Sequence, residues 1–323
     1  MPGTWSGCAP CGHDCKGLCQ RGNKKCDPCR ERLSSCGQGG LEGCACAKEA
    51  TWCVRTSKEV KVALFLGLDL GAVSCDAVLI DEAANIRAFS VVPTAARHIE
   101  ASKKATSEVL EKAKVTMEEV ACVVTTGYGR DLWAPKTFST TEITCHARGI
   151  RYFFPDTELL IDIGGQDSKV IRIANTGKVV DFAMNDRCAS GTGRFLEVMA
   201  RALDLDLSML ESMDEKAKQD LALTTMCTVF AETEVVGMVA QGIDVPDIVR
   251  AIHKSIALRT KGLVRRVAKD VSSLKVSMSG GVARNKAVVR ALSEALSCKI
   301  RVPEHPDIVG ALGAALLGLE SHR

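Results

Sequence analysis

Several features that mark common classes of protein are scarce or missing in this chain of 323 residues. Aromatic residues make up only 4% of it, which argues against a surface that stacks on bases or sugars. The net charge of +3 is too small to predict nucleic-acid binding. No apolar run of membrane-spanning length is free of charge, so no transmembrane helix is predicted. We therefore expect a protein that binds neither nucleic acid nor membrane.

The beginning of the chain also lacks an apolar segment behind basic residues, so no secretory signal is predicted and we expect a cytoplasmic protein. Cysteine, by contrast, is abundant: ten of the sixteen cysteines lie between Cys8 and Cys53. In a reducing compartment, so many thiols favour metal ligation or redox chemistry over disulfides. Their spacing fits neither a bacterial ferredoxin nor a regular zinc finger. An added iron–sulfur centre and a zinc-bound docking module therefore both remain open for this segment.

The composition divides the chain into three parts. Residues 1–58 are poor in aliphatic side chains and cannot form a hydrophobic core alone, so they are expected to be either disordered or organised by a metal, and a metal-binding extension is favoured. The run "VALFLGLDLG" predicts a buried strand that ends in a tight turn, and "TELLIDIGGQDSKVIRIANTGKVVDFAM" repeats this pattern. The repeat predicts an internally duplicated α/β fold, with a first lobe at 59–158, completed by a C-terminal helix at 307–323, and a second at 159–306. Helices are expected at about 193–204, 228–241 and 246–269.

Three glycine turns, in "GLDLG", "IDIGGQDSK" and "MSGGVARN", are suited to a nucleotide. Glycine lets backbone amides approach a phosphate, and Asp can hold Mg²⁺. No GxxxxGK[ST] loop is present. The trio resembles the acetate and sugar kinase, Hsp70 and actin superfamily, in which two ribonuclease-H-like lobes clasp ATP. By that resemblance, Asp69, Asp162 and Gln166 are predicted to be catalytic. The residues predicted to bind the nucleotide are Gly71, Ser74, Gly164, Gly165, Asp167, Lys169, Glu232, Gly280, Gly281 and Asn285. For Lys169, a solvated position on a strand is an equally open alternative.

Cys188 and Cys227 stand apart from the other cysteines because each immediately precedes a helical pattern. A helix N-terminus stabilises negative charge and would favour the thiolate of both. Two ligands are too few for a [4Fe–4S] cluster, but a symmetric dimer would supply four. A nucleophilic role is weaker, because no His and carboxylate pair stands beside either thiol. Two small residues at helix starts, without further function, remain the alternative.

Five stretches together closely resemble the ATP-dependent activators of 2-hydroxyacyl-CoA dehydratases: "TTGYGRDL", "EITCHARG", "IDIGGQDSKVI", "NDRCASGTGRFLEVMA" and "CTVFAETEVV". The family also includes the ATPase subunits of benzoyl-CoA reductases and the reductases of double-cubane cluster proteins. The resemblance implies a homodimer in which Cys188 and Cys227 of both chains hold one [4Fe–4S] cluster. It also implies ATP, ADP and Mg²⁺ as ligands, and a helix movement that drives one low-potential electron onto an iron–sulfur dehydratase or reductase. Ferredoxin or flavodoxin is the expected electron donor.

The first glycine turn departs from the wording usual in that family, which has hydroxyl residues after the glycine and a lysine five positions beyond it. Here Ala72 and Val73 lack hydroxyls, and Asp76 replaces the basic residue. We expect the turn to hold phosphate through backbone groups and Ser74. Two alternative functions are kept: a small-molecule kinase on the same fold and, because of this altered turn, a non-enzymatic nucleotide sensor or chaperone.

A few residues remain undecided at this stage. Arg130 could face the nucleotide, the dimer interface or solvent. Cys145 and His146 look like a metal pair, but structural roles are favoured at adjacent positions. Glu232 and Glu234 are not expected to form an acid/base pair, because a spacing of two points them to different helix faces. Three further cysteines are predicted to be buried packing residues: Cys75, Cys122 and Cys298.

Overall fold

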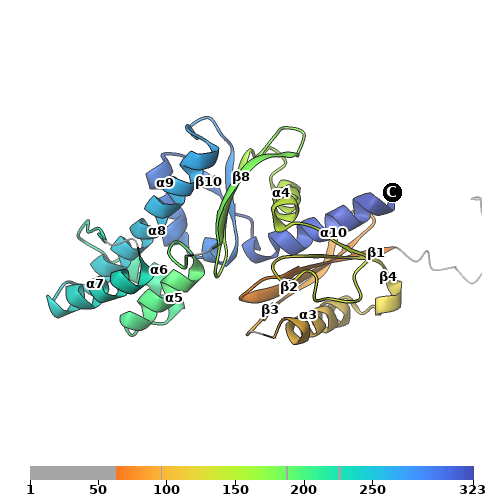
Figure 1. Cartoon of the computed structure of the whole chain (residues 1–323), viewed down its shortest axis with the longest axis horizontal. Coiled ribbons are helices and arrows are strands. Elements are labelled where there is room, and N and C mark those ends of the chain that lie inside the picture. Colours follow the sequence, from red (N-terminus) through yellow and green to blue (C-terminus); the bar gives the residue numbers. More distant parts are fainter. Residues whose placement is uncertain (1–62, 96, 187, 225–226) are drawn as a thin grey trace, which may run out of the picture. The chain divides into compact units, whose positions relative to one another are not determined.

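The computed structural model describes residues 63–323, apart from residues 96, 187 and 225–226. The chain separates into two units between Val60 and Lys61, and everything below concerns the second unit (Figure 1). The ten cysteines from Cys8 to Cys53, for which a metal site is predicted, lie outside the described residues.

The first sheet contains five strands in the order β3-β2-β1-β4-β5. They are β1 (Leu64–Leu70), β2 (Ser74–Asp81), β3 (Ile86–Pro93), β4 (Val120–Thr126) and β5 (Phe138–Ser139). Strands β1 to β3 are antiparallel neighbours, whereas β4 runs parallel to β1 and to β5. Helix α3 (His98–Ala113) packs against β2 and β3, and α10 (Val309–His322) packs against β1, β2 and β4. Alternate residues of β1 enter the two resulting cores, which explains why its sequence is apolar throughout.

The second sheet repeats the first in its connections, in the order β10-β9-β6-β7-β8. Its strands are β6 (Leu159–Ile163), β7 (Ser168–Ile173), β8 (Val179–Asn185), β9 (Val276–Ser279) and β10 (Ile300–Arg301). The same antiparallel and parallel pairings recur, with a register shift near the end of the second strand in both sheets. The predicted α/β fold with an internal duplication is therefore present in the topology.

The helices of the second half carry its core. They are α5 (Gly193–Ala202), α6 (Leu210–Asp214), α7 (Thr228–Ala240), α8 (Val245–Val267) and α9 (Lys286–Leu296), and the three that the sequence predicts end within two residues of the expected positions. Short 3₁₀ turns occur at η3 (Met117–Glu119), η4 (Leu207–Met209), η5 (Gly281–Arg284) and η6 (Pro306–Ile308). Helix α8 packs against β7, β8 and α9. Among the described helices, none is long and apolar enough to cross a membrane.

Helix α4 (Glu142–Phe153) joins the two sheets through its contact with α10 (Figure 1). Its apolar face packs on β6 and β7, while α10 lies on the first sheet. Glycines permit this approach: a Cβ at Gly313 would lie 1.8 Å from the carbonyl oxygen of Cys145, and one at Gly149 would lie 1.9 Å from that of Val309. The small-residue sequence of α10 is therefore a requirement of helix packing.

Three cysteines of this unit were predicted to be buried packing residues, and the structure agrees for two of them. Cys75 and Cys122 are buried, as predicted, whereas Cys298 is only partly buried. Cys298 follows the end of α9, where the chain turns towards the two-residue strand β10, and so little structure covers it.

Candidate functional site

The three predicted glycine turns follow the ends of β1, β6 and β9. Strand β9 is parallel to β6, so the second and third turns lie at the same sheet edge. Ser279 Oγ donates to Asp162 Oδ1 at 2.7 Å. Gly280 adopts φ = +85°, and a Cβ there would lie 2.3 Å from the carbonyl oxygen of Ile163. Gly280 is therefore required both by its backbone conformation and by the close approach of the second turn.

His146 connects the first and second turns. Its Nε2 lies 3.5 Å from Asp69 Oδ2, and its Nδ1 lies 3.4 Å from Asp162 Oδ1. Burial alone would lower the pKa of His146, but the two carboxylates outweigh it and raise that pKa to about 9. The imidazole is thus a buried cation between one carboxylate from each sheet. This bridge between the two sheets is a structural role, as the sequence favoured, and it does not pair His146 with Cys145.

Lys169 is 3% exposed, so the alternative of a solvated strand lysine is wrong. Its Nζ lies 2.9 Å from Asp167 Oδ1, 3.3 Å from Asp162 Oδ2 and 3.4 Å from Glu142 Oε2. These carboxylates raise the pKa of Lys169 although burial opposes them. Burial also opposes ionisation of Asp162, yet His146 and Lys169 lower its pKa. Asp162 is therefore held as a carboxylate, the form that binds Mg²⁺.

The first turn contacts the second through Val73. A Cβ on Gly165 would lie 2.3 Å from Val73 Cγ2, so the side chain of Val73 occupies the space that Gly165 leaves. Ser74 Oγ donates to Asp76 Oδ2 at 3.3 Å, and Asp76 is directly opposite Asp69 across β1 and β2. Burial, followed by the charges of Asp69 and Asp307, raises the pKa of Asp76 well above its usual value. The acid that replaces the expected basic residue is thus stabilised in its neutral form.

The second turn is hydrogen-bonded to the start of α5. The backbone N–H of Gly193 donates to the carbonyl oxygen of Gly164 at 2.9 Å, and that of Arg194 donates to the carbonyl oxygen of Gly165 at 2.8 Å. The first amides of a helix have no partner within the helix, and here the turn supplies their acceptors. A displacement of the turn would therefore be transmitted to α5.

Asn285 begins α9 immediately after the third turn. Its Oδ1 accepts from the backbone N–H groups of Ala287 and Val288 at 3.0 and 3.1 Å, and its Nδ2 lies 3.2 Å from His253 Nε2. His253 Nδ1 lies 2.6 Å from Asp214 Oδ2, and since a carboxylate accepts, Nδ1 donates to it. The Asn285 side chain is therefore occupied in capping α9 and in contact with buried His253.

The two cysteines assigned to a cluster both expose their thiols, but only one begins a helix. Cys227 is the N-cap of α7. Cys188 lies five positions before Gly193, and Thr192 is the N-cap of α5, so the prediction of a thiol at that helix start is wrong. The intervening loop is held by Asn185, whose Nδ2 donates to the carbonyl oxygens of Cys188 and Ser190 at 2.9 and 3.2 Å. Hydrogen bonds from the side chain and backbone of Ser190, followed by the charge of Arg259, lower the pKa of Cys188.

Other predicted residues lie apart from these contacts. Glu232 is in the first half of α7, and the structure gives it no hydrogen bond or ion pair within the described part of the chain. Glu234 instead accepts from the backbone and hydroxyl of Thr224, consistent with the expectation that the two glutamates do not pair. Gln166 is exposed between Gly165 and Asp167. Arg130 donates to the carbonyl oxygen of Gly127 at 3.2 Å and so stabilises the turn after β4.

Two residues at the sites were not singled out from the sequence, Glu142 and Arg259, and His146 was considered only as a metal pair with Cys145 or as structural. Glu142 is the first residue of α4, and its local signal is Thr141, whose hydroxyl accepts from the backbone N–H of Thr144 as an N-cap. His146 follows one helical turn later. Arg259 lies in the middle of α8 and has no local signal, because only folding brings it near the cysteines.

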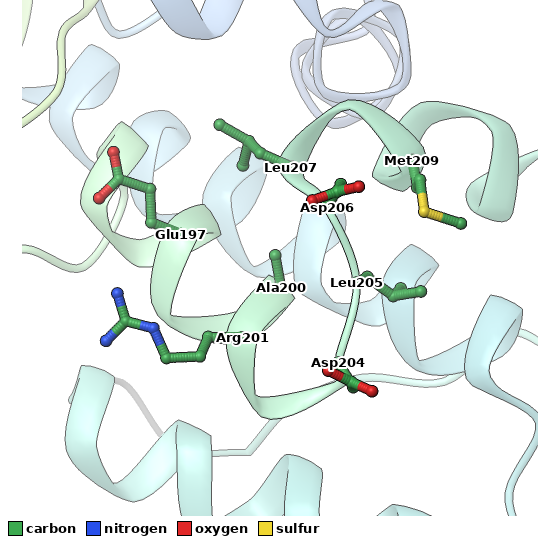
Figure 2. Close-up of a pocket in the computed structure, with 8 residues that line it drawn as sticks. All are labelled: Glu197, Ala200, Arg201, Asp204, Leu205, Asp206, Leu207 and Met209. Carbon is green, nitrogen blue, oxygen red and sulfur yellow. The ribbon is translucent and has the colours of Figure 1, made fainter.

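A hollow of about 530 Å³ opens at the end of α5 and the start of η4 (Figure 2). Its acidic lining comes from Glu197, Asp204 and Asp206, and Leu207 and Met209 form part of its apolar lining. None of its lining residues belongs to the three glycine turns or carries a candidate thiol. It is therefore separate from the predicted nucleotide site.

Comparison with known proteins agrees with this geometry. The model of the BadF/BadG/BcrA/BcrD ATPase family matches residues 66–318. The chain belongs to this family. It is 38% identical over 259 residues to the 2-hydroxyisocaproyl-CoA dehydratase activator of Clostridioides difficile, covering 79% of this chain and 94% of the relative. It is 41% identical over 254 residues to the (R)-2-hydroxyglutaryl-CoA dehydratase activating ATPase of Acidaminococcus fermentans, covering 78% and 95%.

Solved structures of family members and of more distant proteins share the fold. The activator of the 2-hydroxyisocaproyl-CoA dehydratase from Clostridium difficile, with bound ADPNP, superimposes with a TM-score of 0.75 at 36% identity, covering 80% of this chain and 95% of the other. A glucokinase of the ROK family from Streptomyces griseus superimposes with a TM-score of 0.51 at 15% identity, over 80% of this chain and all of the other, which indicates the fold alone. The predicted family and the predicted sugar-kinase-like fold are both confirmed.

Proposed function

We propose that this ATPase-family chain is an ATP-driven electron donor to an iron–sulfur acyl-CoA dehydratase or a related reductase. Two chains would form a homodimer in which Cys188 and Cys227 of each hold one [4Fe–4S] cluster. ATP, with Mg²⁺, would bind at the three glycine turns, and reduced ferredoxin or flavodoxin would supply the electron. The observation that carries the proposal is the pair of hydrogen bonds from the start of α5 to the second turn.

The thiols suit half of a shared cluster. Both are exposed and neither is in a disulfide. Within the described part of the chain, no group of three or more metal-ligating side chains is placed to hold a metal ion, so two thiols per chain need a second chain to complete a set of four. A bound cluster would supply a one-electron carrier. The chain's own contribution is to hold the thiolates, through the hydrogen bonds of Ser190 for Cys188 and the helix start of α7 for Cys227.

The residues at the predicted nucleotide site also support this proposal. Asp162 is kept ionised and Asp69 lies across His146 from it, so Mg²⁺ would meet a carboxylate from each sheet. Gly164, Gly165 and Gly280 have no side chains of their own, which favours the approach of a phosphate to the backbone of the turns, although Val73 packs against Gly165. Ser74 lies at the start of β2 as the hydroxyl of the first turn. In this proposal, Gln166 orients the attacking water, and closure around phosphate moves the carbonyl oxygens to which α5 is bonded.

The cluster assignment is tested by iron analysis of full-length protein purified without oxygen. We expect the Cys188→Ala variant to lose about four irons per dimer relative to the unmodified protein, with the corresponding visible absorption. The difference is informative because any metal bound by the ten N-terminal cysteines is common to both proteins. Cys298→Ala, which removes a partly buried thiol of the same lobe, is expected to keep its iron. Retention of iron and of the dimer in Cys188→Ala would refute the shared cluster.

The coupling is tested by single-turnover oxidation of the reduced dimer with an acyl-CoA dehydratase component. We expect electron transfer with ATP and Mg²⁺, and none with ADP. Phosphorylation of an added small molecule, without any dependence of electron transfer on ATP, would instead identify a kinase. ATP binding without hydrolysis or electron transfer would identify a nucleotide sensor.

A further inference from the structure

We propose that Val73 is a steric gate of the predicted nucleotide site: its side chain covers the face of Gly165 that a phosphate between the first and second turns would have to reach. This inference rests on the proposed function, since it concerns how the same site admits ATP. Valine has no polar side-chain atom and can donate nothing to a phosphate, so its effect on binding is steric.

Three atoms of Val73 fill the space beside the α-carbon of Gly165. A Cβ added to Gly165 would lie 2.3 Å from Val73 Cγ2, 2.7 Å from its Cβ and 3.2 Å from its Cγ1. All three distances are shorter than an ordinary contact between carbon atoms, which is about 3.5–4.0 Å. This face of Gly165 therefore has no room for one methyl group. A phosphate is larger, so it can reach this face only after the two turns separate.

The backbone of the first turn holds Val73 in this position. The backbone N–H of Thr94 donates to the carbonyl oxygen of Val73 at 2.8 Å, and the Thr94 hydroxyl donates to that of Gly71 at 3.0 Å. Thr94 is buried, and the Cβ of Val73 is itself part of the contact, so no rotamer of Val73 clears the face. The side chain is nevertheless 38% exposed, which makes this contact weaker than core packing and allows it to open.

The opposite side of the second turn is closed by the start of α5. A Cβ at Gly193 would lie 3.3 Å from the α-carbon of Gly165. The backbone N–H groups of Gly193 and Arg194 donate to the carbonyl oxygens of the turn. The second turn is thus packed between Val73 and α5. Opening of the gate removes one of these two supports, so the amides at the start of α5 report whether the turn is held.

The test measures how fast full-length protein binds an N-methylanthraniloyl derivative of ADPNP with Mg²⁺, by stopped-flow fluorescence. Val73→Ala removes both methyl groups of the contact. We expect its association to be at least about fivefold faster, because the closed contact lowers the fraction of protein that can admit the nucleotide. Val180→Ala is the control: it shortens an exposed valine of β8, outside the three turns, and should leave the rate unchanged.

Val73→Thr separates obstruction from the missing hydroxyl. Threonine keeps the branched shape, so its association should stay within about twofold of the unmodified rate. Any hydrogen bond from its hydroxyl to phosphate would instead slow dissociation. An unchanged association rate in Val73→Ala would overturn the gate, and so would an equal acceleration in Val73→Thr. If the unmodified protein binds no nucleotide, the proposed function fails and the gate fails with it.

A second readout needs no nucleotide. In protein without added nucleotide, the amides of Gly193 and Arg194 should exchange their hydrogens at least about threefold faster in Val73→Ala than in the unmodified protein. Val180→Ala should leave this exchange unchanged. Equal exchange in all three proteins would show that Val73 does not hold the second turn.

Discussion

At the scale of single residues, His146 determines how the predicted nucleotide site responds to pH. Its imidazole lies between Asp69 and Asp162 and carries a positive charge at neutral pH. In the unfolded chain its pKa would be near 6.5, against about 9 in the folded protein. The folded state therefore binds this proton more tightly than the unfolded state does.

We expect the resulting stabilisation to be complete below about pH 6.5 and to be lost as the pH rises through about 9. The loss would reach roughly 3 kcal/mol if the whole shift contributes. Urea unfolding of metal-free protein between pH 6 and pH 9 measures it. In His146→Gln the fall should be much smaller, whereas His305→Gln, which removes a partly exposed histidine beside exposed Glu304, should retain it. A fall of equal size in both variants would contradict the assignment.

The contacts of His146 could not be predicted from the sequence, whereas the positions of its two partners could. Asp69 and Asp162 were predictable because each ends an apolar run before glycine, and a strand followed by such a turn has a local pattern. The contact of His146 with both depends on α4 lying between two sheets that the sequence places far apart. For Lys169, the sequence left both nucleotide binding and a solvated strand position open for a related reason. Its burial depends on Glu142, Asp162 and Asp167, which surround it only after folding.

At the scale of elements, the start of α9 links the third turn to a buried polar network. Asn285 accepts from two backbone amides of α9 and donates to His253, which in turn bonds Asp214 of α6. The side chains of Asn285, His253 and Asp214 therefore connect α9, α8 and α6, and the first of them lies four residues after Gly281.

We expect Asn285→Ala to lower the free energy of unfolding in two ways. Loss of the cap costs about 1–2 kcal/mol, and leaving His253 Nε2 buried without a donor adds about 1–3 kcal/mol. Asn285→Asp keeps a cap acceptor and removes only the donor, so its loss should be intermediate. Chemical denaturation of both variants provides the comparison. Equal losses in the two would show that the cap contributes nothing, and an unchanged stability of Asn285→Asp would show that the contact with His253 contributes nothing.

Helices were predicted more accurately than short strands. Helices α5, α7 and α8 have long periodic patterns, and their ends were placed within two residues. Strands β5 and β10 have only two residues each and are defined by their pairing partners, so no local pattern specifies them. The start of α5 was predicted well, but the position of Cys188 relative to it was not. The sequence placed the start of the helix near residue 193, and Cys188 was assigned to that start although the four residues between them form a loop, in which Gly191 has positive φ.

At the scale of the whole described unit, the paired helices α4 and α10 connect the two halves of the duplication. Helix α10, from the end of the chain, covers the first sheet, and α4 covers the second. We expect Gly313→Ala to destabilise the unit by at least about 2 kcal/mol, because its Cβ would lie 1.8 Å from the carbonyl oxygen of Cys145.

Thermal and chemical unfolding would measure this loss. Alanine has the higher helix propensity, so propensity alone predicts the opposite sign. Gly262→Ala in α8 is the matched control: a Cβ there meets nothing within 4 Å, and the substitution should stabilise by about 0.5–1 kcal/mol. Stabilisation in both variants would mean that the two helices separate readily.

The contact between Val73 and Gly165 also restricts how this protein can vary. Since the methyl groups of Val73 occupy the volume of a Cβ at position 165, the two positions cannot change independently. A side chain at 165 becomes acceptable only when 73 becomes smaller, so a double substitution of Gly165→Ala with Val73→Gly should be far less harmful than the two separate losses predict. The first and second turns are therefore coupled by packing, because any side chain introduced at position 165 requires a change at position 73.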